Sequence, residues 1–185
     1  MKLAIAAILV ILSGLALWFF FYGNQPGSQL SGLPEPITGG FGVPLGKHFE
    51  PGMVAEVLGE EQKTYKVKDR GELQGRLIRV KPREPSGQFQ EYMVKTTGEG
   101  VIYAVEGKYQ DKELTRKECK GLVKAMAEEM AARHGEPRGK DSFGEWYAFR
   151  QADDHSKSLR LYAHRCRSGM YSIVYTDEKV RKESD

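Results

Sequence analysis

The amino-acid sequence predicts an α+β fold, in which a mainly antiparallel sheet carries one amphipathic helix and follows an N-terminal transmembrane helix. The first observation is an apolar run from Leu3 to Tyr22 in a chain that is otherwise polar. The second is alternation of apolar and polar residues between Gln62 and Val105, which is typical of strands with one wet face. The third is a helical pattern with start and stop signals over residues 115–134. The chain has 185 residues, enough for one ordinary domain and additional segments.

The apolar run has the length and the boundary of a membrane span. Its only weakly polar residues are Ser13, Gly14 and Tyr22. An α-helix rises about 1.5 Å per residue, so residues 3–22 are long enough to cross the roughly 30 Å hydrocarbon core. The run ends in Trp18-Phe-Phe-Phe-Tyr22, an aromatic cluster of the kind found at membrane interfaces. We therefore predict a transmembrane signal-anchor over residues 1–22.

Charge around the run predicts its orientation. Lys2 precedes it, and no further Lys or Arg follows until Lys47. The positive-inside tendency then places the N-terminus in the cytoplasm and the rest of the chain in the periplasm or outside, held by the cytoplasmic (inner) membrane. A cleaved signal peptide is the alternative, with residues 3–12 as its apolar stretch and Gly14 and Ala16 before the cut. Cleavage would leave an apolar new N-terminus, which favours the uncleaved anchor.

Composition divides the remaining chain into three parts. Residues 23–40, GNQPGSQLSGLPEPITGG, are rich in Gly, Pro and Ser and predict a flexible linker. Residues 41–176 predict a single α+β domain. Residues 177–185 are mostly charged and predict a tail that frays.

Local patterns predict the elements of the domain. Turn residues at 81–87 and 97–100 separate the alternating segments between residues 62 and 105. Further strands are expected at 145–150, 159–166 and 170–176, with a short hairpin link at 167–169. A short helix is expected at 53–58.

The helix over residues 115–134 has the clearest local signals. Thr115 and Glu118 have the spacing of a capping box, in which each side chain bonds a backbone N–H that the helix leaves free. Gly135 and Pro137 are stop signals. Apolar residues recur at three- and four-residue spacing and form one stripe that should pack on the sheet: Cys119, Leu122, Val123, Met126 and Met130.

These features together carry a resemblance to a class of proteins. The motif Phe41-Gly-Val-Pro-Leu-Gly46 precedes a strand region, a Cys-bearing helix ends in His134-Gly-Glu-Pro137, and a terminal hairpin follows. The combination, covering most of residues 41–176, resembles small bacterial membrane-anchored envelope proteins of uncharacterised function. The resemblance implies an envelope location and no named activity.

The two cysteines predict one disulfide bond. Cys119 lies on the apolar stripe of the helix, and Cys166 ends a strand expected to pack beneath it. A bond is unstrained when the two Cα atoms lie roughly 4.4–6.8 Å apart. An even cysteine count outside the cytoplasm favours this reading. Two buried free thiols, expected in a reducing cytosol, are the alternative.

One group of basic residues is a candidate binding face. Alternation on neighbouring strands places the cations on the wet side of the sheet, where they would meet an anionic partner: Lys66, Lys68, Arg79 and Lys81. Acidic residues such as Glu60, Glu61 and Glu72 lie nearby, so an ordinary charged surface is the alternative. Trp146 and Tyr147 point to opposite faces of their strand, and an exposed member of the pair would suit partner contact.

No constellation of residues predicts a reaction. Asp153-Asp154-His155 contains metal-capable side chains, but it lies in an expected hairpin loop. Phosphate loops, paired zinc ligands and nucleophile elbows are absent from the sequence. The net charge of +3 is too balanced to imply a nucleic-acid partner. We therefore expect no cofactor, no metal and no catalysis.

Three functions remain after these exclusions. The favoured one is a membrane-anchored extracytoplasmic interaction or accessory domain with an envelope protein as its partner. The first alternative is a domain that binds an anionic lipid or an envelope polymer, and the second is an enzyme of unknown type.

Overall fold

The computed structural model of the protein describes residues 34–67, 71–140, 146–151, 153–163 and 165–183. The predicted transmembrane helix and residues 23–33 of the predicted linker lie outside these ranges. No helix in the described ranges is both long and apolar enough to span a bilayer. The compact unit that contains the described residues runs from Pro34 to Asp185.

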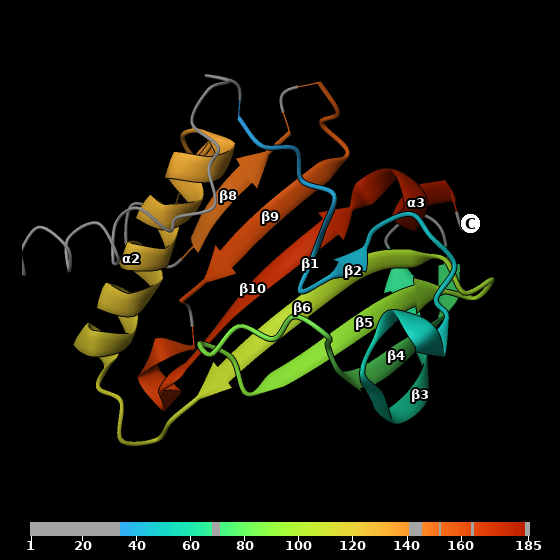
Figure 1. Ribbon diagram of the computed structural model, residues 1–185, viewed down its shortest axis with the longest axis horizontal. Helices are drawn as coiled ribbons and strands as arrows, with labels where there is room; N and C mark the ends of the chain where they lie inside the picture. Colours follow the sequence, from blue (N-terminus) through green and yellow to red (C-terminus); the bar gives the residue numbers. More distant parts are fainter. Residues whose placement is uncertain (1–33, 68–70, 141–145, 152, 164, 184–185) are drawn as a thin grey trace, which may run out of the picture. The chain divides into compact units, whose positions relative to one another are not determined.

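The described residues form one antiparallel sheet of eight strands, which confirms the expected sheet (Figure 1). From one edge to the other, the strands are β3 (Glu56–Val67), β4 (Gly71–Lys81), β5 (Glu91–Thr97), β6 (Ile102–Gln110), β10 (Met170–Asp177), β9 (Lys157–Tyr162), β8 (Trp146–Arg150) and β7 (Gly139–Lys140). The last strand in sequence thus joins the two halves, because β10 pairs with both β6 and β9.

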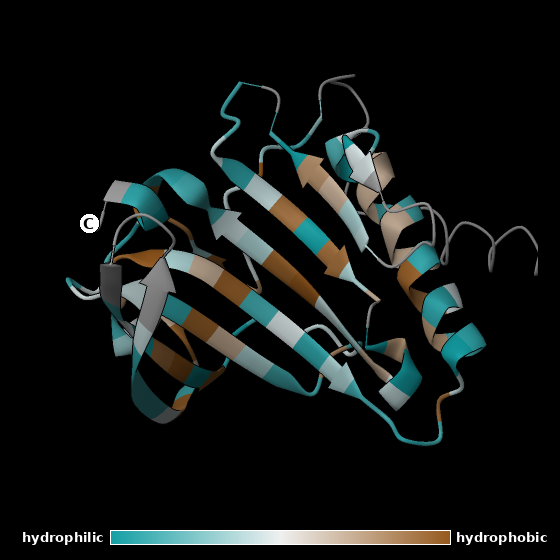
Figure 2. Ribbon diagram, turned by 180° about the vertical axis from the view of Figure 1, so that it is seen from behind, coloured by the Kyte–Doolittle hydropathy of each residue, from teal (hydrophilic) through white to brown (hydrophobic). Residues whose placement is uncertain are grey.

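Alternation along these strands separates a covered face from an open face. Ile78 lies opposite Val94, and Val94 lies opposite Val105, so apolar side chains from three strands share the covered face. Leu161 and Ile173 continue it on β9 and β10. Intervening residues point to the other face, and the resulting alternation of hydrophobic and hydrophilic residues along the strands is visible in Figure 2.

Helix α2 (Arg116–His134) covers one half of the apolar face and confirms the predicted helix. Thr115 and Glu118 form the capping box, and Gly135 ends the helix. The buried side chains of α2 are Cys119, Val123, Met126, Ala127 and Met130. Leu122, expected in this stripe, is instead 43% exposed, because it lies at the margin of the buried face while Ala127 completes that face.

The N-terminal part of the domain covers the other half of the apolar face. Strands β1 (Gly39–Gly40) and β2 (Val43–Pro44) form a hairpin whose first strand contacts β6 and β10. Ile37 is 1% exposed, so residues 34–40 belong to the domain rather than to the predicted linker. The expected helix at 53–58 is also wrong: a 3-10 turn, η1 (Pro51–Met53), precedes β3, whose backbone pairs with β4 from Glu56 onwards.

The C-terminal region differs from the sequence prediction at two points. Strand β9 ends at Tyr162, and Cys166 lies in a 3-10 turn, η2 (Cys166–Ser168), so the connection to β10 is longer than the hairpin link expected at 167–169. Helix α3 (Glu178–Glu183) occupies most of the segment predicted to fray. Its start is stabilised because Asp177 Oδ1 accepts hydrogen bonds from the backbone N–H groups of Lys179 and Val180.

The predicted disulfide between Cys119 and Cys166 is confirmed. The two sulfur atoms lie at bonding distance, and the Cα atoms are 5.5 Å apart. Both residues are buried. The bond joins the first turn of α2 to η2 and thereby fixes the helix over the β8–β9–β10 half of the sheet.

Candidate functional site

The basic face predicted from sequence is only partly described. Lys68 lies outside the described residues, and for Lys66 the structure describes only the backbone, which pairs with Glu72. Arg79 and Lys81 are exposed on β4. Lys81 lies opposite Glu56, and Arg79 acts electrostatically on Glu61. The described part of this face therefore carries both signs of charge, and its role as an anion-binding face stays a prediction.

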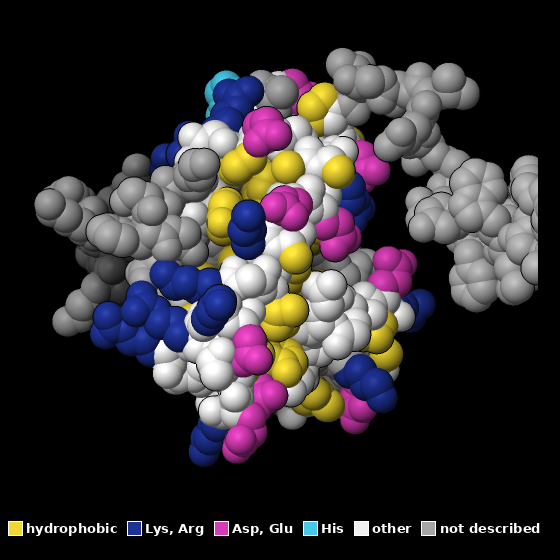
Figure 3. Space-filling model, turned by 90° about the vertical axis from the view of Figure 1, so that its left-hand side faces the viewer, with side chains coloured by type: hydrophobic (Ala, Val, Ile, Leu, Met, Phe, Trp, Pro, Cys, Tyr) yellow, Lys and Arg dark blue, Asp and Glu magenta, His cyan; other side chains and the backbone are white. Residues whose placement is uncertain are grey.

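The side of the domain that carries α2 also mixes its charges. Apolar side chains form a band down the middle of this side, acidic side chains lie along it, and several Lys and Arg side chains gather at its left edge (Figure 3). Lys124 and Glu128 form an ion pair along the helix.

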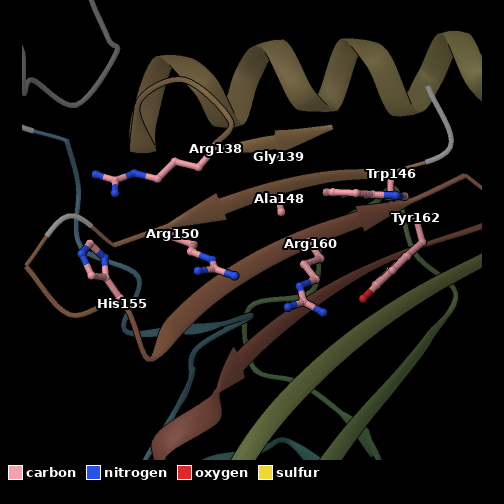
Figure 4. A pocket seen from close by; sticks show the side chains of 8 residues that line it. All are labelled: Arg138, Gly139, Trp146, Ala148, Arg150, His155, Arg160 and Tyr162. Atoms are coloured by element: carbon pink, nitrogen blue, oxygen red, sulfur yellow. The ribbon is translucent and has the colours of Figure 1, made fainter. Parts of the chain in front are cut away.

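A groove on the open face of the sheet does stand out. It lies over β7, β8 and β9, on the side opposite to the buried residues of α2, and has a volume of about 760 Å³. Its lining residues come from these strands and from the adjoining loops (Figure 4): Arg138, Gly139, Trp146, Ala148, Arg150, His155, Arg160 and Tyr162.

Strand register explains how these side chains come together. Trp146 lies opposite Tyr162, and Ala148 lies opposite Arg160. Trp146, Ala148 and Arg150 are two residues apart on β8, so all three face the groove while Tyr147 and Phe149 face the core. Alternation alone does not determine which of Trp146 and Tyr147 is exposed. Trp146 is the exposed one, at 37%.

The absence of a side chain at Gly139 leaves space for the indole of Trp146. A Cβ at position 139 would lie 2.9 Å from Cζ3 and 3.0 Å from Cη2 of Trp146, closer than real side chains approach. The Cζ3–Cη2 edge of the six-membered ring therefore lies against the backbone of β7. Ala148, also small, forms the neighbouring part of the groove.

The arginines of the groove differ from other cations of the open face in their pairing. Lys95 Nζ lies 2.8 Å from Glu106 Oε2, and Lys108 Nζ lies 3.8 Å from Glu106 Oε1, so these cations have a carboxylate. In the described part of the chain, neither Arg138 nor Arg150 has an ion pair or a side-chain hydrogen bond.

Arg160 and His155 complete the cationic part of the groove. Arg160 has one distant carboxylate, since its Nη2 lies 3.9 Å from Glu178 Oε1, and Glu178 lies closer to Arg181. His155 Nδ1 lies 3.1 Å from the backbone oxygen of Gln151, which fixes the ring at the rim. Among the described residues, the groove therefore gathers guanidinium groups with little compensating negative charge.

The acidic residues beside His155 are occupied locally. Asp153 accepts a hydrogen bond from Gln151, and Asp154 accepts hydrogen bonds from Ser156. These bonds are the leading cause that lowers the pKa of each carboxyl group. Among the described residues no group of three or more His, Cys, Asp or Glu side chains could hold a metal. The metal-capable tripeptide is thus a hydrogen-bonded turn.

The described lining of the groove has the chemistry of an anion-binding surface. Its described lining residues include arginine, histidine, tryptophan and tyrosine, and no carboxylate or thiol. Guanidinium groups match carboxylate and phosphate oxygens with two parallel hydrogen bonds. The three arginines of the groove were not predicted from the sequence. One signal was present, because the two-residue spacing of Trp146, Ala148 and Arg150 places their side chains on one face of a strand.

Comparison with protein-family models, with curated proteins and with solved structures finds no match for this chain. The resemblance to envelope proteins that the sequence suggests therefore stays a prediction.

Proposed function

We propose that the protein is a membrane-anchored extracytoplasmic interaction module, and that it binds an anionic ligand in the groove over β7, β8 and β9. An interaction domain and an anionic partner are both expected from the sequence. The proposed binding site, however, lies in the opposite part of the sheet from the basic residues of β4. The proposal includes no catalytic step.

Two observations support the compartment. The apolar run at residues 3–22 has the length of a membrane span and follows the only basic side chain before Lys47. The bond between Cys119 and Cys166 belongs to an oxidising environment, because reduced thiols are the rule in the cytosol.

We infer the class of ligand from two arginines of the groove that have no ion pair in the described part of the chain. Arg138 and Arg150 are exposed and have no carboxylate partner in the described part of the chain, while Arg160 is close enough to share the same groove. Cations gathered without counter-charges repel one another, and an anion relieves this repulsion. A charge-assisted hydrogen bond contributes about 1.5–3 kcal/mol when it is shielded from water.

A matched pair of double variants tests the proposal. Arg150→Gln with Arg160→Gln removes two charges from the groove, and Arg79→Gln with Lys81→Gln removes two charges from β4. Binding of fluorescent dextran sulfate to the full chain in uncharged nanodiscs is measured by anisotropy, with neutral dextran as a control.

We expect the groove variant to weaken dextran sulfate binding at least about tenfold, the effect of losing about 1.4 kcal/mol. The β4 variant should change it less than about threefold, and added salt should weaken the wild-type complex. Equal losses in both variants would show that bulk charge, rather than the groove, binds the polymer.

A further inference from the structure

The groove has two chemically different ends. Trp146 and Tyr162 lie at one end, Arg138, Arg150 and His155 lie at the other, and Arg160 lies between them (Figure 4). A simple anion would use only the second end. The groove is therefore shaped for a ligand that is anionic in one part and offers a flat or apolar surface in another.

At the aromatic end of the groove, the ring of Trp146 is accessible to a ligand. Trp146 and Tyr162 are direct cross-strand neighbours, so both side chains leave the open face at the same end of the groove, where the indole turns towards β7 and the phenol turns away from it (Figure 4). The absence of a side chain at Gly139 lets the Trp146 ring lie against β7, while the ring stays 37% exposed. An exposed ring in this position has a face that a ligand can stack on.

The separation of the two ends excludes the smallest ligands. Trp146 and Arg150 lie four residues apart on β8, which corresponds to about 13 Å at about 3.3 Å per residue. No single phosphate or carboxylate spans this length. A ligand that uses both ends must be extended, and the open groove lets a chain pass along it.

We propose that this ligand is an acidic saccharide chain, bound with one sugar ring stacked on the Trp146 indole and its acidic groups at Arg150 and Arg160. The inference rests on the proposed function and names its ligand class. A sugar presents a flat C–H face to an aromatic ring, and its carboxylate or phosphate groups suit the guanidinium fork. An acidic peptide would contact only the cationic end. A single-stranded nucleic acid could stack a base on the indole and place its phosphates at the arginines. Both are therefore tested as competitors.

Calorimetry on the full chain in uncharged nanodiscs compares four probes. They are oligogalacturonate, a neutral maltooligosaccharide, polyglutamate and single-stranded oligothymidylate, matched in length. We expect oligogalacturonate to bind at least about tenfold more tightly than the maltooligosaccharide, which lacks the charge, and than polyglutamate, which lacks the ring, a difference of about 1.4 kcal/mol. It should also bind more tightly than oligothymidylate, because a net charge of +3 is too balanced to favour a nucleic-acid partner. Equal or tighter binding of polyglutamate or oligothymidylate would overturn the saccharide assignment.

Variants of Trp146 separate stacking from charge. We expect Trp146→Ala to weaken oligogalacturonate binding about tenfold, as the loss of a stacked ring does elsewhere, and to change polyglutamate binding less than about twofold. Trp146→Phe should retain most of the affinity, and it controls for folding because it keeps a ring at this position. Equal losses for both probes would overturn the stacking role.

The two proposals can fail separately. If Arg150→Gln with Arg160→Gln abolishes binding of every polyanion while Trp146→Ala affects none, the anion-binding function stands and the saccharide inference fails. If the arginine variant has no effect on any probe, both fail. In a Trp18→Phe chain, Trp146 is the only tryptophan of the sequence, and its fluorescence should shift on addition of oligogalacturonate but not of polyglutamate.

Discussion

The ring of Phe41 occupies the space that a side chain at Gly107 would need. A Cβ at position 107 would lie 2.7 Å from Cζ of Phe41. Phe41 adopts a positive φ of 57° in the turn between β1 and β2, a conformation unusual for a bulky residue. Its ring packs edge-on against Tyr92, with centroids 4.8 Å apart, and against Phe89, at 5.5 Å. These contacts offset the backbone strain and hold the N-terminal segment on β6.

Substitutions at these two positions should therefore be strongly coupled. Phe41→Ala should lower the free energy of unfolding by about 3 kcal/mol through lost packing, and Gly107→Ala by about 1–3 kcal/mol through overpacking. In a Phe41→Ala background, Gly107→Ala should cost less, because the closest clash is gone and only Phe89 Cγ, 3.0 Å from the added Cβ, remains. Urea denaturation of the four proteins measures this coupling. Additive losses would mean that the ring and the glycine do not share this space.

The bond between Cys119 and Cys166 should stabilise the domain chiefly by restricting its unfolded state. Cys119→Ala with Cys166→Ala should lower the free energy of unfolding by about 2–4 kcal/mol. Both sulfurs are buried, so the bond should resist reductant until the domain unfolds. Thiol counting on denatured protein, with and without prior reduction, checks the bond. Two reactive thiols before reduction would exclude it.

The location of the domain can be tested independently of any ligand. We expect a phosphatase reporter fused after Asp185 to be active only outside the cytoplasm, because residues 3–22 should hold the chain with its N-terminus inside. Inserting Lys residues directly after Tyr22 should weaken this orientation. The mass of the purified protein distinguishes the anchor from a cleaved signal peptide. A reporter active only in the cytosol would contradict both the compartment and the proposed ligand.

Stability at alkaline pH should depend on Tyr171. Its ring stacks on Tyr109 at 4.9 Å, and its hydroxyl donates to the backbone oxygen of Gln88 over 3.2 Å. Burial first, and the charge of Tyr109 second, raise the pKa of Tyr171 from 10.0 to about 12. The folded protein thus keeps this proton while the unfolded chain releases it.

The resulting contribution to stability is complete below pH 10 and is lost as the pH rises towards about 12. Tyr171→Phe should make the free energy of unfolding fall less steeply over this interval. Burial also raises the pKa of Tyr92 and Tyr175, so part of the pH dependence should remain. Urea denaturation at a series of alkaline pH values measures both slopes. Equal slopes for wild type and variant would contradict the assignment to Tyr171.

Elements with local signals were predictable from the sequence. The capping box of Thr115 and Glu118 located the start of α2 because both bonds form within one turn. Alternation of apolar and polar residues located β4 to β6, because this pattern also lies within each short stretch of sequence. The connection before β10 was not predictable, since Gly169 must take a positive φ of 64° beside the backbone of Asp111, a distant part of the chain.

The groove depends on information that no local pattern contains. Arg138, Arg150 and Arg160 belong to three segments, and they meet only because Ala148 pairs with both Gly139 and Arg160. Alternation on β8 separates Trp146 from Tyr147, but it does not say which face α2 covers. The predicted basic residues, in contrast, come from two nearby stretches of the sequence, 66–68 and 79–81, where neighbouring acidic residues are visible.

The contact between Gly139 and Trp146 offers a test that leaves every charge of the groove in place. Gly139→Val should displace the Trp146 ring, because a Cβ at position 139 would lie 2.9 Å from it. Strand β7 is a short edge strand, so the domain should tolerate the change. We expect weaker oligogalacturonate binding and red-shifted Trp146 fluorescence in a Trp18→Phe chain. Gly87→Val, at a position with open space around it, is the control. Unchanged binding with a displaced ring would show that the ligand does not use the indole.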